Sequence, residues 1–162
     1  MTTIFDTART VLIRVDFNVP VHNGNILDLT RIELSLPTLK YFLKLNMSII
    51  LISHLGRPTC WDQNYSLKPL VKPLSKLLNK QVLFSSDSLK ITNESIIDKL
   101  LPKEILLLEN LRFYPGELTN DIVFAKSLSK YGDIYINDAF GVSHRNHASV
   151  SAIQQFFPNQ KY

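Results

Sequence analysis

The chain has 162 residues, a length that suits one domain. Apolar residues make up 45% of it and charged residues 20%, close to ordinary globular usage, so disorder of the whole chain is excluded. Lysine and arginine outnumber aspartate and glutamate by 18 to 14, and this mild excess permits an anionic ligand or nucleic acid without requiring either.

Cys60 is the only cysteine, which excludes disulfide scaffolds and cysteine-based zinc sites and suits a reducing compartment. Residues 1–10 contain no basic stretch followed by an apolar run, so they do not predict a signal peptide. No apolar run approaches the roughly 20 residues needed to cross a bilayer. We therefore expect a soluble, cytoplasmic protein with no membrane partner.

Five short apolar runs alternate with helical patterns along the chain. Several are apolar at consecutive positions, as in strands covered on both faces. They predict strands at Val11–Val15, Met47–Ile52, Gln81–Phe84, Ile105–Leu108 and Ile134–Ile136. The polar segment Ser85–Asn93 predicts a loop. Strands separated by helices are typical of βαβ units, so we predict an α/β protein with a parallel sheet.

Three helical patterns lie between these strands, and prolines affect where two of them begin. In the first, Pro37 either begins the helix or kinks it. The second follows Ser66, a candidate N-cap, and its regular part is expected to start around Pro73, because a proline deeper in a helix removes a backbone hydrogen bond. The third pattern includes Phe124 and Leu128.

Polar and charged residues follow four of the predicted strands at the points where the strands end. These loops are residues 16–20, 53–58, 109–113 and 137–141, the last of them followed by His144 and Arg145. In an open parallel sheet, ligands bind beyond the carboxyl ends of the strands. The four loops are therefore expected to form one edge with a binding site.

Arg31, Arg57, Arg112 and Arg145 would all face this edge. The planar guanidinium pairs with two oxygens of a carboxylate or phosphate and stays charged. Several guanidiniums at one edge repel one another unless a multiply charged anion binds between them. The sequence thus predicts a pocket for a small, highly anionic ligand, to which His54 could add a hydrogen bond.

Several familiar motifs are absent from the sequence. None of the five glycines forms G-x-G-x-x-G, G-x-x-x-x-G-K-[ST] or G-x-S-x-G, which excludes the dinucleotide, P-loop and nucleophile-elbow signatures. Gly56 and Gly141 would instead let the backbone approach a ligand closely. His144 and His147 have a spacing seen in metal sites, but no further His or Cys cluster supports one, and a structural role is favoured for both.

Structural roles compete with binding at several positions. Arg14 lies inside a strand and is expected to make a structural ion pair, while Asp138 is expected to fix its own loop. Asp16 and Asn18 could cap the turn after the first strand. The lysines expected on a solvated helix face include Lys72, Lys76 and Lys80.

At its loops the sequence resembles the phosphoglycerate kinase family. The matching segments are R-V-D-F-N-V-P at Arg14–Pro20, Arg31-Ile32 with Leu36–Thr38, S-H-L-G-R-P at Ser53–Pro58, L-L-E-N-L-R-F at Leu107–Phe113, Gly132-Asp133, N-D-A-F-G at Asn137–Gly141, and His144-Arg145 with His147–Ser149. They appear in family order and run from about Val11 to about Ser151. Each motif alone is modest, but their shared order leaves little room for chance.

The resemblance implies a fold and a division of labour between two domains. In the family, an amino-terminal Rossmann-like domain binds 3-phosphoglycerate, and a carboxy-terminal one binds Mg-ATP or Mg-ADP. We therefore expect residues 1–162 to form a single, monomeric substrate-binding domain. Its fold would be a three-layer αβα Rossmann-like parallel sheet, incomplete at its carboxy-terminal end, where an apolar patch or strand edge would be exposed. The nucleotide and its magnesium would bind the missing domain, so we expect neither a tightly bound cofactor nor a metal here.

The resemblance also assigns roles to individual residues. Those implied to bind the substrate are Asp16, Phe17, Asn18, Arg31, His54, Leu55, Gly56, Arg57, Arg112 and Arg145. Asp16 and Asn18 would orient the glycerate part, and the last three arginines of the set would hold its phosphate. Arg31 would be the catalytic residue, because it would stabilise the phosphoryl group in flight. A carboxylate nucleophile is ionised at pH 7, so no general base is needed.

Three functions remain open from the sequence. In the first, the chain is part of a phosphoglycerate kinase, which transfers a phosphoryl group between ATP and the carboxylate of 3-phosphoglycerate. In the second, it is a non-catalytic module that only binds a small phosphorylated anion. The third, a nucleic-acid surface, is disfavoured because the arginines belong to loop motifs and no pattern of aromatic and basic residues accompanies them.

Overall fold

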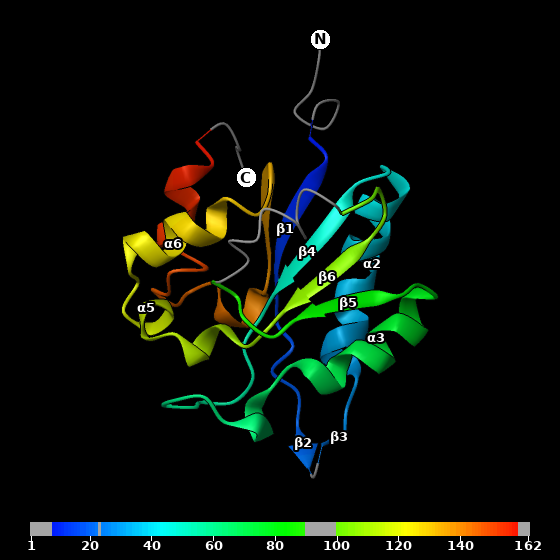
Figure 1. Ribbon diagram of the computed structural model, residues 1–162, viewed down its shortest axis with the longest axis horizontal. Coiled ribbons are helices and arrows are strands. Elements are labelled where there is room, and N and C mark those ends of the chain that lie inside the picture. Colours follow the sequence, from blue (N-terminus) through cyan, green and yellow to red (C-terminus); the bar gives the residue numbers. More distant parts are fainter. Residues whose placement is uncertain (1–7, 23, 90–99, 159–162) are drawn as a thin grey trace.

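The protein is built around a five-stranded parallel sheet in the strand order β5-β6-β4-β1-β7 (Figure 1). The computed structural model describes residues 8–22, 24–89 and 100–158. The strands are β1 (Thr10–Val15), β4 (Ser48–Ile52), β5 (Val82–Ser85), β6 (Ile105–Leu108) and β7 (Ile134–Asp138). The five predicted strands and the parallel α/β sheet are confirmed. In the predicted loop Ser85–Asn93, β5 continues into Ser85, residues 86–89 are irregular, and residues 90–93 lie outside the described part.

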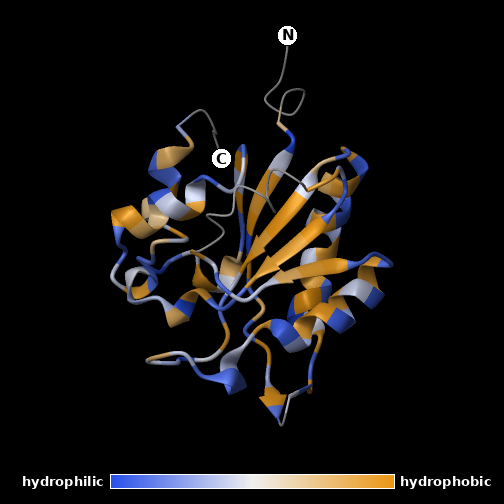
Figure 2. Ribbon diagram, viewed as in Figure 1, coloured by the Kyte–Doolittle hydropathy of each residue, from blue (hydrophilic) through white to orange (hydrophobic). Residues whose placement is uncertain are grey.

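The two central strands are buried from end to end. Residues 11–15 of β1 and all of β4 lie inside the protein, and β1 pairs in register with β4 so that Leu12 lies beside Ile50. Figure 2 shows that the strands carry the most continuous apolar colouring in the chain. Consecutive apolar residues therefore marked strands that are covered on both faces, as expected.

One face of the sheet is covered by α2 (Thr30–Lys44) and α3 (Val71–Leu78). The prediction that the first helix begins near Pro37 is wrong, because α2 begins at Thr30 and continues through Pro37. Proline has no N–H to donate to the carbonyl of Glu33, one turn earlier. The helix is held regardless by core contacts on both sides of the proline, including those of Ile32 and Leu39.

The start of α3 combines a confirmed prediction with a correction. The regular helix begins at Val71, so Pro73 is its third residue and lies in the first turn, where no backbone N–H is required. Ser66 does not cap this helix. Its Oγ accepts a hydrogen bond from the N–H of Lys68 at 3.2 Å, and the 3₁₀ turn at Lys68–Leu70 that precedes α3 has Leu67 at its N-cap, without a side-chain cap.

The other face of the sheet is covered by α5 (Pro115–Leu118), α6 (Ile122–Ser129) and a 3₁₀ segment at Ala152–Phe156 (Figure 1). The third predicted helix is α6, with Phe124 and Leu128 buried. The three layers of the predicted αβα architecture are therefore present. No described helix has the length and apolar character needed to cross a membrane.

Two features lie outside this three-layer core. A short antiparallel hairpin, β2 (Val21–His22) with β3 (Asn25–Ile26), projects below the sheet and was not predicted (Figure 1). At the opposite side of the sheet from β5, β7 is an edge strand, and Phe140 just after it is 91% exposed. The sequence led us to expect an exposed apolar patch or strand edge near the end of the chain.

Candidate functional site

Loops from four strands meet at the carboxyl edge of the sheet, as the sequence predicted. The parallel strands all point toward this edge (Figure 1). A pocket of about 550 Å³ opens there between the loops that follow β4, β6 and β7. It is lined by Arg57, Pro58, Thr59, Arg112, Pro115, Leu118, Thr119 and Arg145. The three arginines predicted to hold a phosphate therefore share one pocket, although they are far apart in the sequence.

Arg112 is held in the pocket wall from both ends. Its backbone N–H donates to Oδ1 of Asn110 at 3.0 Å, and its Nη1 donates to the carbonyl of Gly56. Asn110 is itself fixed, because its Nδ2 donates to the carbonyl of Leu55 at 2.8 Å. Burial, followed by the nearby charge of Arg145, lowers the pKa of Arg112. The guanidinium is thus a rigid and poorly solvated cation.

Two guanidinium nitrogens of this pocket are buried without a partner. They are Nε of Arg112 and Nε of Arg145, and in the described part of the chain neither atom has a hydrogen-bond partner. A buried N–H without an acceptor costs roughly 1–3 kcal/mol, more when the group is charged. Both residues line the pocket, so an anion bound there would lie beside these two guanidiniums. Arg57, by contrast, is exposed at the rim.

Gly56 is required by the shape of the pocket wall. Its φ of +62° lies in the left-handed region, and a Cβ at this position would come within 2.3 Å of the Tyr65 ring. The N–H of Gly56 donates to Oδ1 of Asn18 at 2.8 Å. The same residue therefore connects the loop after β1 to the carbonyl that holds Arg112.

Arg31 and Asp16 form a second cluster, separate from the residues that line the pocket. Nη1 of Arg31 pairs with Oδ2 of Asp16, and 49% of the Arg31 side chain is exposed. The N–H of Asn18 donates to the other carboxylate oxygen of Asp16 at 3.3 Å. A Cβ at Gly141 would lie 2.9 Å from Oδ2 of Asp16, so the loop after β7 closes onto this pair. The expected single set of four arginines is therefore divided, with Arg31 held by an acid.

His54 lies behind the pocket and not among its lining residues. It is 2% exposed, and its Nδ1 lies 2.8 Å from Nη2 of Arg14. Burial, together with the charge of Arg14, lowers the pKa of His54 to about 2. The ring is therefore neutral at pH 7, with Nδ1 accepting the hydrogen bond from Arg14 and the proton on Nε2.

Phe17 and Leu55 place their side chains in the apolar core, with 0% and 3% of their surface exposed. They face the loops only through their backbones. The N–H of Phe17 donates to Oγ of Ser53 at 2.9 Å. If either residue contacts a ligand, it does so through main-chain atoms.

The network around Arg14 contains residues that sequence reasoning missed. Nε of Arg14 donates to Oγ of Ser149 at 3.0 Å, and that hydroxyl donates to Oε1 of Glu117 at 2.6 Å. The expected direct ion pair of Arg14 is therefore replaced by a hydroxyl with a carboxylate beyond it. Glu117 is completely buried. Buried arginines need a counter-charge, and that requirement was the one signal that could have pointed to an acid here.

The structural role predicted for Asp138 is wrong, and its neighbour Asn137 has that role. Asp138 does not fix its own loop, because its Oδ1 accepts from Oγ1 of Thr38 at 3.0 Å and so ties β7 to α2. Asn137 has the predicted role instead, since its Oδ1 accepts from the N–H of Ala139 at 3.1 Å. Burial raises the pKa of Asp138.

Neither histidine of the closely spaced pair belongs to a metal cluster in the described residues. His144 is exposed, and Nδ1 of His147 lies 4.0 Å from Oε1 of Glu117. Over the described ranges, no group of three or more His, Cys, Asp or Glu side chains could hold a metal ion.

Known proteins resemble this chain over nearly its whole length. A family model described as phosphoglycerate kinase matches residues 3–162. A phosphoglycerate kinase of Wolbachia from Brugia malayi is 47% identical over 93% of the chain, and one from Nitratiruptor is 53% identical over 91% of it. The chain spans only 38% and 37% of these two relatives.

Solved structures agree with the sequence comparisons. Phosphoglycerate kinase from Coxiella burnetii superposes with a TM-score of 0.80 at 34% identity, over 91% of this chain and 37% of that one. The enzyme from Pyrococcus horikoshii gives a TM-score of 0.79 at 32% identity, over 89% of this chain and 37% of that one. The three-layer fold described above is thus the fold of the matching part of these proteins.

Proposed function

The chain belongs to the phosphoglycerate kinase family, and we propose that its arginine pocket binds the phosphate group of 3-phosphoglycerate. In this proposal the chain supplies the substrate side of a reversible phosphoryl transfer in glycolysis. The chain spans about 38% of the length of the first of these relatives. We assign the second substrate, magnesium-bound ATP or ADP, to no residue of this chain. We further propose that it acts as a monomer in the cytoplasm and has no nucleic-acid partner.

One observation carries the proposal: Nε of Arg112 and Nε of Arg145 are buried without acceptors beside the same pocket. A phosphate monoester carries about two negative charges and three oxygens that accept hydrogen bonds. It can therefore take both orphaned N–H groups and the charge of Arg57 at once. An uncharged ligand would leave the three guanidiniums repelling one another.

The Asp16–Arg31 cluster provides the other end of the proposed substrate site. Asp16 and Asn18 would orient the glycerate part of the substrate. Arg31 would leave its ion pair with Asp16 and pair with the substrate carboxylate. In the reaction, a carboxylate oxygen attacks the γ-phosphorus of ATP as the bond to the ADP oxygen breaks. The products are 1,3-bisphosphoglycerate and ADP. Arg31 would stabilise the charge on the transferring phosphoryl oxygens, and no proton needs to be removed from the ionised carboxylate.

A second candidate function is binding of the phosphorylated anion without turnover. It is favoured by the position of Arg31, which is paired with Asp16 and lines none of the arginine pocket. Turnover of 3-phosphoglycerate and ATP, measured by coupling ADP formation to NADH oxidation, separates the two candidates. A rate above the background of an Arg31→Ala variant supports catalysis by this chain, and no such rate supports binding alone.

Calorimetric titration with 3-phosphoglycerate tests the shared element of both candidates. We expect the parent chain to bind and Arg112→Ala to bind at least about tenfold more weakly, since hydrogen bonds to charged groups contribute roughly 1.5–3 kcal/mol. Lys76→Ala is the matched control, because this lysine is exposed on α3 and lines none of the arginine pocket. Equal affinity of the parent and Arg112→Ala would count against the proposal.

A further inference from the structure

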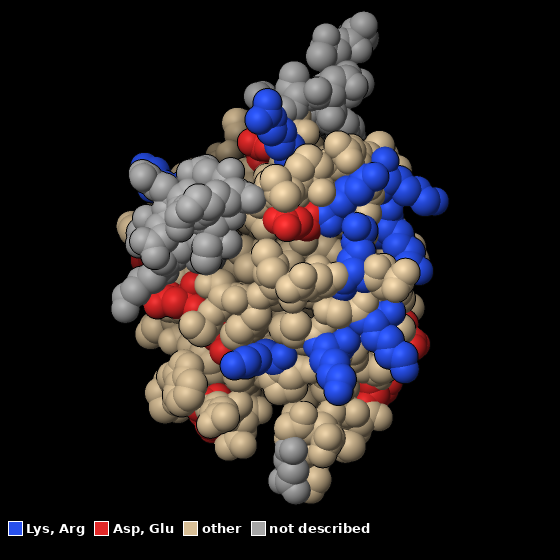
Figure 3. All heavy atoms as spheres, turned by 45° about the vertical axis from the view of Figure 1, so that its right-hand side comes forward, with Lys and Arg blue, Asp and Glu red and all other residues tan. Residues whose placement is uncertain are grey.

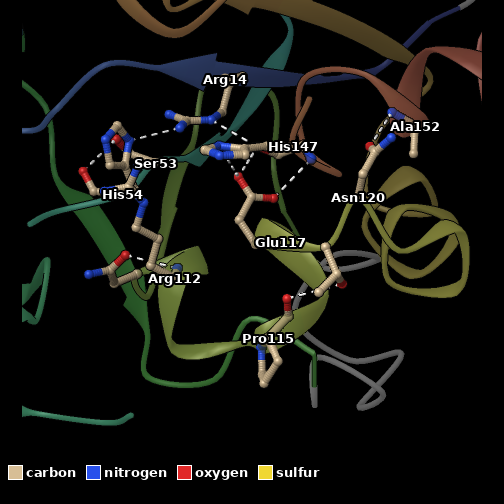
Figure 4. A network of polar contacts seen from close by, with 12 residues as sticks. Arg14, Ser53, His54, Arg112, Pro115, Glu117, Asn120, His147 and Ala152 are labelled. Atoms are coloured by element: carbon tan, nitrogen blue, oxygen red, sulfur yellow. Dashed lines mark hydrogen bonds and ion pairs between the residues drawn. The ribbon is translucent and has the colours of Figure 1, made fainter. Parts of the chain in front are cut away.

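The wall behind the arginine pocket is formed by the segment around α5. Pro115, Leu118 and Thr119 of this segment line the pocket, while Glu117 between them turns inward and is completely buried. Figure 4 shows its carboxylate pointing toward Arg14 and His147. The side chain is therefore positioned to act on the pocket from behind, without contact with a ligand.

Glu117 holds the segment that carries Arg145. Its Oε2 accepts from the N–H of Ser149 at 2.9 Å, its Oε1 accepts from Oγ of Ser149 at 2.6 Å, and its carbonyl accepts from the N–H of Ala148 at 2.9 Å. His147 adds a contact, with Nδ1 4.0 Å from Oε1. Residues 147–149 are thus fixed directly after Arg145.

A second residue of the same segment reinforces this attachment. Nδ2 of Asn120 donates to Oδ1 of Asn146 at 2.8 Å, and Oδ1 of Asn120 accepts from the N–H of Ala152 at 3.1 Å (Figure 4). Residues 117–120 therefore hold the loop that carries Arg145 at several points between 146 and 152.

The attachment also reaches the loop after β4. Oγ of Ser149 accepts from Nε of Arg14 at 3.0 Å, and Nη2 of Arg14 lies 2.8 Å from Nδ1 of His54. Burial lowers the pKa of Arg14, and the charge of Glu117 opposes that effect. One buried carboxylate thus connects three loops of the site through a serine and an arginine.

Resting on the function proposed above, we propose that Glu117 is a positioning residue, whose buried carboxylate holds the 144–149 loop so that Arg145 faces Arg112 across the pocket. It touches neither the substrate nor the reacting atoms. In the absence of an anion, the two guanidiniums repel each other. The hydrogen bonds between Glu117 and residues 148–149, which we call the clamp, keep Arg145 in place against that repulsion. The preformed pocket then binds an anion without first having to order the loop.

Two variants separate this role from a plain electrostatic one. Glu117→Gln keeps the shape but removes the charge and one acceptor, and Glu117→Asp keeps the charge but withdraws it from Ser149. If Glu117 only weakened the positive potential of the pocket, Glu117→Gln would bind anions more tightly and Glu117→Asp would bind them as the parent does. A positioning role predicts weaker binding of 3-phosphoglycerate in both, by about tenfold.

The measurement combines calorimetry with amide hydrogen exchange on the 162-residue chain. In Glu117→Gln without ligand, we expect the amide of Arg145 to exchange about tenfold faster, whereas that of Leu51 in β4 keeps its rate, which shows that the change is local. The control is Glu104→Gln, which removes the charge of a carboxylate that accepts from the N–H of Leu101 at the other end of the sheet. This control is expected to match the parent in both readouts.

The outcomes distinguish this inference from the proposed function. Parent-like affinity in both Glu117 variants, or tighter binding in Glu117→Gln, overturns the positioning role while the substrate proposal stands. If the parent itself binds no 3-phosphoglycerate, the proposed function fails, and the exchange rate of Arg145 alone decides the inference. An unchanged rate in Glu117→Gln then overturns it, and a faster one supports the clamp.

Discussion

The arginines of the pocket and the lysines of α3 are two groups of cations with different surroundings. The arginine pocket places Arg112 and Arg145 against protein, each with a buried Nε that has no acceptor. The lysines of α3, by contrast, project into solvent on the side opposite the core residues of that helix. Figure 3 shows basic side chains spread over the face that carries α2 and α3.

Both groups are positively charged, so burial and not charge determines how strongly each of them binds an anion. An exposed lysine is solvated by water, so an anion that pairs with it gains only about 0–1 kcal/mol. A buried guanidinium has already lost water, so an anion that supplies its acceptor gains considerably more. The formal charge of +4 therefore says little about where an anion binds. The arginine pocket has buried N–H groups without acceptors, whereas the lysines of α3 are solvated.

The largest expected effect comes from disturbing the wall of the arginine pocket. Gly56→Ala should lower the free energy of unfolding by about 2–4 kcal/mol, since it combines a left-handed φ with a clash against Tyr65. Gly24→Ala is the matched control, with a φ of +75° but no atom within 4 Å of the added Cβ. It should cost only about 1 kcal/mol. Equal losses in urea denaturation would show that the wall at Gly56 is not tightly packed.

Acid should destabilise the protein through His54. Its pKa is lowered from 6.5 to about 2 by burial and by Arg14, so the unfolded chain binds a proton that the folded chain does not. The contribution of His54 to the free energy of unfolding is therefore fully present above pH 6.5. It is lost as the pH drops from 6.5 toward 2, by at most about 1.4 kcal/mol per pH unit.

The histidine contribution can be isolated by comparing two variants. His54→Gln, which retains a possible acceptor for Arg14, should show a shallower loss of unfolding free energy between pH 6.5 and 4.5. His144→Gln is the control for replacing a histidine, because this side chain is exposed and lies outside the contact with Arg14. The same slope in both variants would show that His54 is not the buried neutral group described here.

A smaller effect is expected at the rim of the arginine pocket. Arg57 is exposed, so Arg57→Ala should weaken binding of 3-phosphoglycerate only about two- to fivefold, in line with an exposed ion pair. Calorimetry should thus rank this variant between the parent and Arg112→Ala. A loss as large as that of Arg112→Ala would mean that burial does not set the difference between the cations.

The smallest effect is expected on the lysine face. Lys72→Ala should change the free energy of unfolding by no more than about 0.5 kcal/mol, as is usual for exposed positions. Its affinity for 3-phosphoglycerate should stay within about twofold of that of the parent. A larger loss of affinity would place the anion site on α3.

The sheet could be predicted from sequence because it depends on local patterns. Apolar runs such as Ile105–Leu108 need cover on both faces, and that requirement is visible in the order of residues. The start of α2 was harder to place, because local proline chemistry suggested a boundary at Pro37 while core packing carried the helix through it. The β2–β3 hairpin has only two residues in each strand, too few for an alternating pattern.

The site was predicted in its members but not in its arrangement. Strand ends and arginines indicated that Arg57, Arg112 and Arg145 would meet, and they line one pocket. The pairing of Arg31 with Asp16 depends on how two loops approach each other, which no spacing encodes. The role of Glu117 could not be predicted, because its burial depends on how the segments around residues 117 and 149 pack together.

The most direct test of the central claim follows the arginine side chains themselves. In nitrogen-15 NMR of the chain during titration with 3-phosphoglycerate, the Nε–H resonances of Arg112 and Arg145 should shift together and saturate at one ligand equivalent. In the proposed complex, both groups would gain their missing acceptor from the same anion. Resonances of Arg112 and Arg145 that stay unchanged at saturating ligand would contradict the account.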